Sequence, residues 1–188
     1  ARTGKVRSGN STAAIYLMDK YDFMPISFGY KLKQYADDIF GYLSEDITRP
    51  CPFGGVEVVG KRKPRKLYQK FGQLMREIDP DVWIKHAEKS MRAWENFRDT
   101  RGIVIDDLRQ PNEYEWARDN GFVIIRIVAD DRLRLDRANR LGDIYDESAL
   151  NHETESHIDT FDVDFEIVNN GNLDDLKRQI DEIMEAID

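Results

Sequence analysis

Short apolar runs that alternate with amphipathic segments are the feature that most constrains the fold of this chain. Residues 103–105 and 122–128 are two such runs, and segments with helical spacing separate them. Unbroken apolar runs are typical of parallel strands that helices cover on both faces. Weaker strand patterns occupy residues 23–28 and 165–168. The alternation predicts an α/β fold with a parallel sheet.

Apolar residues spaced three and four apart predict the helices around these strands. We expect helices at about residues 13–21, 30–43, 67–78, 80–97, 112–120, 130–143 and 173–187. Asn172 is the predicted cap of the last one. Proline and glycine interrupt residues 44–64, which we interpret as a flap within one domain spanning residues 1–188.

Composition narrows the class of protein further. The net charge is -8 over 188 residues, so binding to duplex nucleic acid is disfavoured. No apolar stretch is long enough for a transmembrane helix, and no membrane partner is expected. Cys51 is the single cysteine, which excludes an internal disulfide and suits a reducing cytoplasm.

The sequence Gly4-Lys5-Val6-Arg7-Ser8-Gly9-Asn10-Ser11 carries the strongest local signal. A P-loop reads G-x-x-x-x-G-K-[ST], and every defining position matches except the lysine, which is Asn10 here. Backbone N–H groups and the N-terminus of the following helix do most of the binding in such loops. The expected phosphate-binding residues are Gly4, Ser8, Gly9, Asn10, Ser11 and Thr12, with the Ser11 hydroxyl also directed to Mg²⁺.

Asn10 lacks the full positive charge that lysine brings to the phosphates. Loss of one such electrostatic stabiliser typically costs about 3–4 kcal/mol in the transition state. Lys5 lies at the entry of the loop and is expected to point elsewhere. The same residues are also compatible with a glycine-rich turn that caps a helix and binds no ligand.

Polar residues at the end of the 103–105 strand form a second candidate site. Asp106, Asp107 and Arg109 follow this strand directly, and ligands of open α/β sheets gather at such carboxyl ends. A carboxylate there can hold Mg²⁺, and an arginine can bind a phosphate through two hydrogen bonds. A solvated loop with an ordinary salt bridge is the alternative.

Arginines spaced along the basic helix form a third candidate. Arg134, Arg137 and Arg140 are three residues apart and share one helix face. Such a face suits a lid that closes over a phosphoryl group. Ion pairs with Asp130, Asp131 and Asp136 explain the spacing equally well.

Several segments, taken in order along nearly the whole chain, resemble the deoxynucleoside monophosphate kinases encoded by bacteriophages. More distantly, they are similar to animal phosphomevalonate kinases. The matching segments are TGKVRSGNST, FGYKLKQYA, YQKFGQLMREIDPDVWI, VIDDLRQPNE, NHETESHID and IVNNGNLDDL. The resemblance implies a three-layer P-loop kinase fold with about five parallel strands. It also implies Mg²⁺-dependent transfer of a phosphoryl group from ATP to a deoxynucleoside 5′-monophosphate.

The resemblance further implies roles for individual residues. An acceptor-binding region would span about residues 29–97, and a lid about residues 132–157. The implied residues are Lys33, Gln69, Arg76, Trp83 and Glu113 for the acceptor, Asp107, Arg109, Arg137 and Arg140 for catalysis, Asn169 and Gly171 beside the adenine, and Ser11 with Asp107 for the metal.

Two other functions stay open at this point. Asn10 is compatible with a nucleotide-binding protein of the same fold whose catalysis is impaired, and the lid and loop would look the same in a kinase for another phosphorylated small molecule. The location expected is the cytoplasm, or that of the host for a phage-encoded protein. Association into a homodimer is left open.

Overall fold

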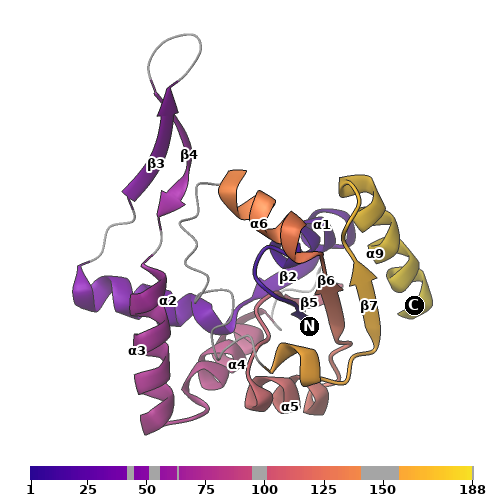
Figure 1. The fold of residues 1–188 in the computed structure, drawn as a ribbon. Helices are drawn as coiled ribbons and strands as arrows, with labels where there is room; N and C mark the ends of the chain where they lie inside the picture. The colour runs from indigo at the N-terminus through magenta and orange to yellow at the C-terminus, as the bar shows by residue number, and fades with distance from the viewer. Residues whose placement is uncertain (42–44, 51–55, 63, 95–100, 141–156, 188) are drawn as a thin grey trace.

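A computed structural model describes residues 1–41, 45–50, 56–62, 64–94, 101–140 and 157–187 of the chain. Helices and parallel strands alternate along it, as the apolar runs predict (Figure 1). The helices are α1 (Asn10–Tyr21), α2 (Phe28–Phe40), α3 (Arg65–Ile78), α4 (Val82–Trp94), α5 (Pro111–Asp119), α6 (Asp131–Arg140) and α9 (Leu173–Ile187), with a 3₁₀ turn at Ile158–Thr160. None of them combines the length and apolar character needed to cross a bilayer.

Five strands run parallel, and they form two hydrogen-bonded ladders. They are β1 (Arg2–Thr3), β2 (Phe23–Ile26), β5 (Gly102–Ile105), β6 (Ile125–Val128) and β7 (Phe165–Val168). One ladder has the order β1-β6-β7, and the other pairs β2 with β5. The Leu108 amide, just after β5, donates to the Arg2 carbonyl at 3.3 Å and links the two.

The described residues contain five parallel strands, but they form ladders of three and two strands and not the single sheet of about five that was predicted. The reason lies in β1, which is only two residues long. Backbone groups of successive strand residues face opposite neighbours, so a strand of two residues that pairs with β6 offers the β5 side only the Arg2 carbonyl, which is too little for a ladder. The strand predicted at residues 122–128 also begins later, at Ile125.

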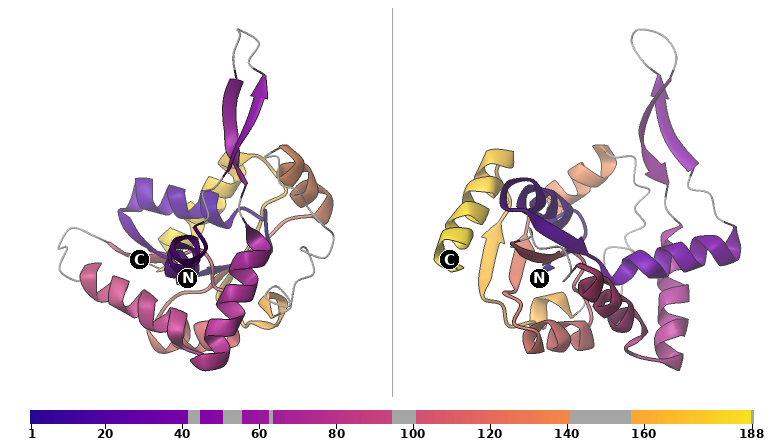
Figure 2. Two further views of the ribbon diagram at one scale, coloured as in Figure 1. Left: turned by 90° about the vertical axis from the view of Figure 1, so that its left-hand side faces the viewer. Right: turned by 180° about the vertical axis from the view of Figure 1, so that it is seen from behind.

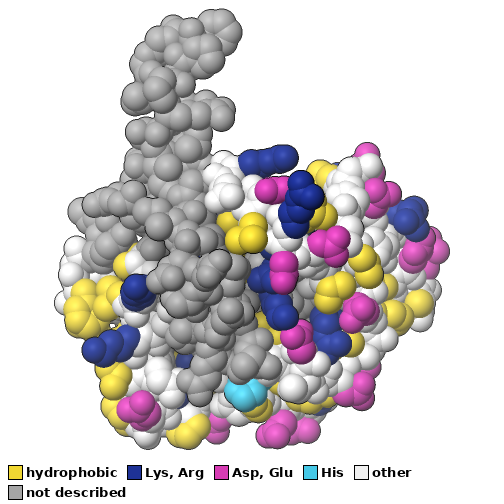
Figure 3. All heavy atoms as spheres, viewed as in Figure 1, with side chains coloured by type: hydrophobic (Ala, Val, Ile, Leu, Met, Phe, Trp, Pro, Cys, Tyr) yellow, Lys and Arg dark blue, Asp and Glu magenta, His cyan; other side chains and the backbone are white. Residues whose placement is uncertain are grey.

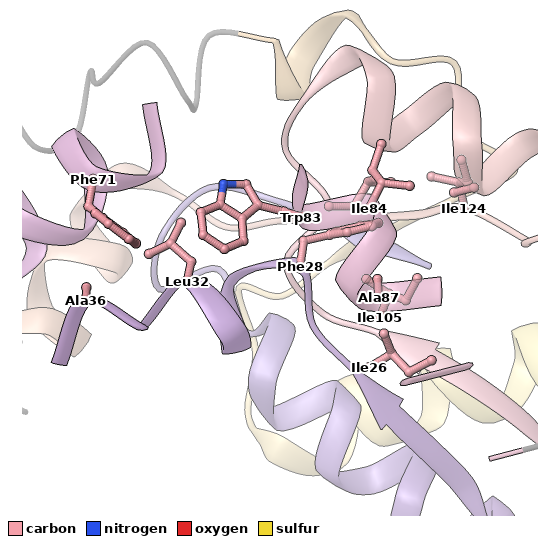
Figure 4. Packing of buried hydrophobic residues seen from close by; sticks show 12 residues of the cluster. Ile26, Phe28, Leu32, Ala36, Phe71, Trp83, Ile84, Ala87, Ile105 and Ile124 are labelled. Carbon is pink, nitrogen blue, oxygen red and sulfur yellow. The ribbon is translucent and has the colours of Figure 1, made fainter. Parts of the chain in front are cut away.

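Helices cover both faces of the strands, which gives the three layers expected of this fold class. Ile105 packs with α2, α4 and α5, whereas its neighbour Val104 packs with α1 and α9. Successive residues of a strand point to opposite faces, so one short apolar run supplies both clusters. Figure 4 shows the first cluster, in which Trp83 lies close to Leu32 and Phe28.

The interrupted segment 44–64 contains an antiparallel hairpin of two strands, β3 (Glu45–Pro50) and β4 (Val56–Arg62). The hairpin projects away from the layered part of the molecule in every view (Figures 1 and 2). The hairpin lies within the segment that the sequence analysis interprets as a flap. Cys51 lies outside the described residues.

The helix predictions agree with the structure to within a few residues at most ends. The α9 helix begins after Asn172, whose Oδ1 accepts hydrogen bonds from the amides of Asp174 and Asp175 at 2.8 and 3.0 Å. This is the geometry of a helix N-cap. The helix predicted at 130–143 is described up to Arg140, and the one predicted at 80–97 up to Trp94.

Candidate functional site

The glycine-rich loop, Gly4–Ser11, connects β1 to α1 and curls back on itself. The Ser8 amide and hydroxyl both donate to the Lys5 carbonyl, at 3.1 and 2.8 Å. Arg7 has a φ of 66° and Gly9 a φ of 118°, so the backbone enters the left-handed region twice within three residues. Successive residues of opposite hand direct backbone N–H groups into one concave nest that suits an anion.

Gly9 is required by its surroundings as well as by its backbone angles. A Cβ atom there would lie 2.4 Å from Nδ2 of Asn169. That nitrogen donates to the Ser8 carbonyl at 2.7 Å, and the Asn169 side chain is buried. The residue after β7 therefore supports the loop from below, which joins two segments far apart in the sequence.

Asn10 occupies the position at which the P-loop pattern has lysine. Its Nδ2 donates to the Gly4 carbonyl at 2.9 Å, so the amide ties the start of α1 to the start of the loop. Its Oδ1 is buried and has no hydrogen-bond partner among the described residues. Lys5 forms an ion pair with Asp159 at 2.8 Å. The loop thus carries a neutral amide where a cation is expected.

A cavity of about 670 Å³ opens in front of this loop. Its walls come from the glycine-rich loop, the starts of α1 and α2, one side of α3, the segment after β5, α6 and the segment after β7. The predicted site residues that line it are Gly9, Asn10, Ser11, Thr12, Lys33, Gln69, Arg76, Asp107, Arg109, Glu113, Arg137, Asn169 and Gly171.

The remaining predicted residues do not line the cavity. Gly4 and Ser8 are buried within the loop itself. Trp83 is 2% exposed and belongs to the apolar core, where its Nε1 donates to the Gly72 carbonyl at 3.3 Å. Arg140 ends α6 and is exposed. The structure therefore assigns Trp83 to core packing, because its position in α4 directs the indole toward Phe71 and Leu32.

Two adjacent carboxylates at the end of β5 have different partners. The Ser11 hydroxyl donates to Asp106 at 3.3 Å. Asp107 instead accepts hydrogen bonds from the Ser27 hydroxyl (2.6 Å) and from the amides of Phe28 (3.0 Å) and Gly29 (2.8 Å). Asp107 thus caps the N-terminus of α2, and Asp106 is the carboxylate beside Ser11.

The sequence analysis placed Asp106 in the candidate segment after β5, but the metal role was given to Asp107 rather than to Asp106. Asp106 lines the cavity and follows β5 directly, so its place immediately after the apolar run was the available signal. Burial raises the pKa of Asp106, and the neighbouring Asp107 charge adds to this rise. Arg2 and the Ser11 hydroxyl act in the opposite direction.

Glu113 organises the opposite wall of the cavity. It is 3% exposed, and its Oε2 accepts hydrogen bonds from the amides of Arg109 and Gln110, both at 3.0 Å. Its Oε1 lies 3.4 Å from Arg76 Nη2. Burial raises the pKa of this carboxyl, and the Asp107 charge adds to the effect. The carboxylate therefore fixes the turn that carries Arg109 and holds Arg76 at the cavity wall.

The basic helix α6 packs against the glycine-rich loop. Arg134 Nε donates to the Val6 carbonyl at 2.9 Å, and Arg137 donates to the carbonyls of Asn169 (2.9 Å) and Arg7 (3.4 Å). These contacts bring Arg137 to the edge of the cavity. The rest of the predicted lid, from 141 to 156, lies outside the described residues. On the face drawn in Figure 3, basic and acidic side chains are interspersed where side chains are coloured.

The chemistry of the cavity is that of an oxygen-rich site with several cations around it. The described residues contain no group of three His, Cys, Asp or Glu side chains that would enclose a metal ion. A hydroxyl and one carboxylate are nevertheless the ligands that Mg²⁺ typically takes from a protein when phosphates supply the others. Ser11 and Asp106 fit that donor set.

Comparisons with known proteins agree with this architecture. A solved structure, "Crystal structure of TT1252 from Thermus thermophilus", has a TM-score of 0.59 at 14% sequence identity, over 100% of this chain and 96% of that chain. This similarity shows a shared fold. No curated protein sequence matches the chain. The family described as "Deoxynucleotide monophosphate kinase" matches residues 60–180, from β4 to within α9. The chain therefore belongs to the deoxynucleotide monophosphate kinase family.

Proposed function

We propose that the protein transfers the γ-phosphoryl group of ATP to the 5′-phosphate of a deoxynucleoside monophosphate, giving the diphosphate. The observation that carries this proposal is the convergence on one cavity of the glycine-rich loop, the acidic end of β5 and the cationic side of α2 and α3. Phosphoryl transfer depends mainly on positioning and charge neutralisation, and those are the features that this cavity offers.

The ATP side of the site is assigned to the loop and to the end of β7. Backbone amides of the loop and the N-terminus of α1 would hold the phosphates. Arg137 lies between the Arg7 and Asn169 carbonyls, at the border of the loop and the cavity. From there its guanidinium can approach charge that develops on the transferred group. Asn169 and Gly171 line the same end and are the proposed neighbours of the adenine.

Mg²⁺ is the proposed metal, and the residues that would hold it are Ser11 and Asp106. When bound, the ion would neutralise charge on the β- and γ-phosphates. Ser11 was predicted for this role from the sequence, together with Asp107. The hydrogen bonds that Asp107 accepts from Ser27, Phe28 and Gly29 favour a different role for it, namely fixing the start of α2 beside β5.

The acceptor side is assigned to Lys33, Gln69, Arg76 and Arg109. Lys33 lies on α2 one turn after Gly29, and its Nζ would be 3.5 Å from a Cβ at that glycine. Arg76 on α3 is held by Glu113, as described above. Two helices and the β5 loop thus place cations around a space that can receive the phosphate of a mononucleotide.

The test is an assay of ADP release, coupled to an indicator reaction, with each of the four common deoxynucleoside monophosphates. We expect release that requires ATP, Mg²⁺ and at least one acceptor. Lys33→Gln should raise KM for the acceptor about tenfold or more, because a hydrogen bond to a charged group contributes about 1.5–3 kcal/mol.

Lys31→Gln on the same helix is the matched control. Lys31 does not line the cavity, and its Nζ donates to Gln34 at 2.8 Å. We expect unchanged kinetics in this variant. Absence of ADP release with every acceptor, in protein shown to be folded, would refute the proposed reaction.

Asn10 favours one second candidate, a protein that binds the nucleotide with little catalysis. Its amide is neutral and is committed to the Gly4 carbonyl. Calorimetry separates the two candidates, since this alternative predicts heat on titration with Mg·ATP but no ADP release. Release with phosphomevalonate and with none of the nucleotides would indicate a different phosphorylated acceptor.

A further inference from the structure

Arg2 is an unusual residue to find buried beneath the glycine-rich loop. Its side chain is 1% exposed, and its Nη1 donates to the Asn10 carbonyl at 2.7 Å. Its Nε and Nη2 are buried as well and have no hydrogen-bond partner among the described residues. The guanidinium therefore has one hydrogen bond where five N–H donors are available.

This guanidinium retains its charge at neutral pH. Burial lowers the pKa of Arg2 to about 10, and the nearby Asp106 acts in the opposite direction. No ion pair of Arg2 is seen in the described parts of the chain, so Asp106 acts through space. A buried cation without a direct counter-ion is costly, and an anion bound nearby relieves that cost. Screening by salt is also weak at a buried position.

The glycine-rich loop above Arg2 brings no positive charge at position 10, where the P-loop pattern has lysine. Position 10 carries a neutral amide that is tied to Gly4, and Lys5 is paired with Asp159. Arg134, which also contacts the loop, donates to a carbonyl and to Asp131. At the start of α1, the neutral Asn10 therefore lies directly above the cationic side chain of Arg2.

We propose that Arg2 supplies, from beneath the glycine-rich loop, the positive charge that Asn10 does not carry, and so acts as a positioning residue for a bound triphosphate. Its contact with the Asn10 carbonyl fixes the first turn of α1, whose amides face the anion. This inference rests on the proposed function, and it moves the role of the P-loop lysine from position 10 to position 2.

The test is calorimetric titration with Mg·ATP of the wild-type chain and four variants, Arg2→Met, Arg2→Lys, Asn10→Lys and the double variant Arg2→Met with Asn10→Lys. We expect Arg2→Met to weaken binding about tenfold or more, as expected for loss of a charge in a weakly screened site. Arg2→Lys should retain more of the affinity than Arg2→Met, because lysine brings an amine that can be charged, although it lacks the planar guanidinium.

The effects of substitutions at positions 2 and 10 on the affinity for Mg·ATP should depend on each other. A merely structural role of Arg2 does not predict this dependence. In the wild-type background Asn10→Lys should improve binding by less than about threefold, since the charge is already present. In the Arg2→Met background the same lysine should restore about tenfold or more. Equal effects of Asn10→Lys in both backgrounds would overturn the inference.

Arg126→Met is the matched control, because Arg126 is also largely buried in the same sheet but donates to the carbonyls of Ile158 and Phe161. It should leave binding unchanged. If Arg2→Met does not fold by circular dichroism, Asn10→Lys alone decides, and a gain above about threefold contradicts the inference.

The outcomes also separate this inference from the proposed function. Wild-type protein that gives no heat with Mg·ATP would refute both. Binding that is insensitive to Arg2 refutes only the role of Arg2. Binding that depends on Arg2, without ADP release from any acceptor, refutes only the proposed reaction.

Discussion

Replacing Gly9 by alanine should destabilise the fold through a specific collision. The backbone there has a φ of 118°, and a sparsely populated angle of this kind costs a residue with a Cβ about 1–3 kcal/mol. The new Cβ would also lie 2.4 Å from Asn169 Nδ2. Asn169 must then move and lose its buried hydrogen bond to Ser8, which costs about a further 1–3 kcal/mol.

The free energy of unfolding should therefore fall by about 2–6 kcal/mol in Gly9→Ala. This is a large part of the roughly 5–15 kcal/mol by which a typical domain is stable. Urea denaturation followed by circular dichroism measures it directly. Gly121→Ala is the matched control, because Gly121 has a φ of 72° and no atom within 4 Å of an added Cβ. That variant should lose only the backbone part, about 1–2 kcal/mol.

The difference between the two variants isolates the contact with Asn169. If Gly9→Ala destabilises the protein no more than Gly121→Ala, then Asn169 does not support the glycine-rich loop. That result would refute the close contact between Gly9 and Asn169. In the proposed function, Gly9→Ala should also weaken Mg·ATP binding, whereas Gly121→Ala should not.

Two further substitutions test the walls of the cavity. Gly72→Ala places a Cβ 2.5 Å from Leu32 Cδ1, between α3 and α2. We expect urea denaturation to show a loss of about 1–3 kcal/mol in the free energy of unfolding. An unchanged free energy of unfolding would contradict the close packing of these helices. Burial raises the pKa of Glu113 above its ordinary 4.5. At pH values between 4.5 and the raised pKa, Glu113 therefore holds a proton in the native chain that it releases in the unfolded chain. The free energy of unfolding contributed by Glu113 should therefore fall as the pH rises from about 4.5 through the raised pKa. Denaturation at a series of pH values should show this slope in the wild type and not in Glu113→Gln, and identical pH profiles would refute the assignment.

Local patterns in the sequence were sufficient for much of the fold. The run at residues 165–168 predicts β7 with the observed bounds, and Asn172 caps α9 as expected. These features depend on neighbours close in the chain, because side-chain period and capping are local properties. The sequence analysis singled out the glycine-rich loop, the β5 end and the basic helix as separate candidates, and residues of all three line one cavity.

Contacts between distant segments decided what the sequence left open. Asp106 and Asp107 are adjacent and chemically identical, and only their separate partners, Ser11 and the start of α2, distinguish them. Trp83 fits either a ligand site or a core by its residue type, and the packing of α4 on α2 and α3 places it in the core. The sequence alone did not indicate a role for Arg2. Its proposed role depends on the position of β1, which places the guanidinium under Asn10. Sequence periodicity determines which face of an element is buried, whereas the partner of each polar group depends on how those elements pack in three dimensions.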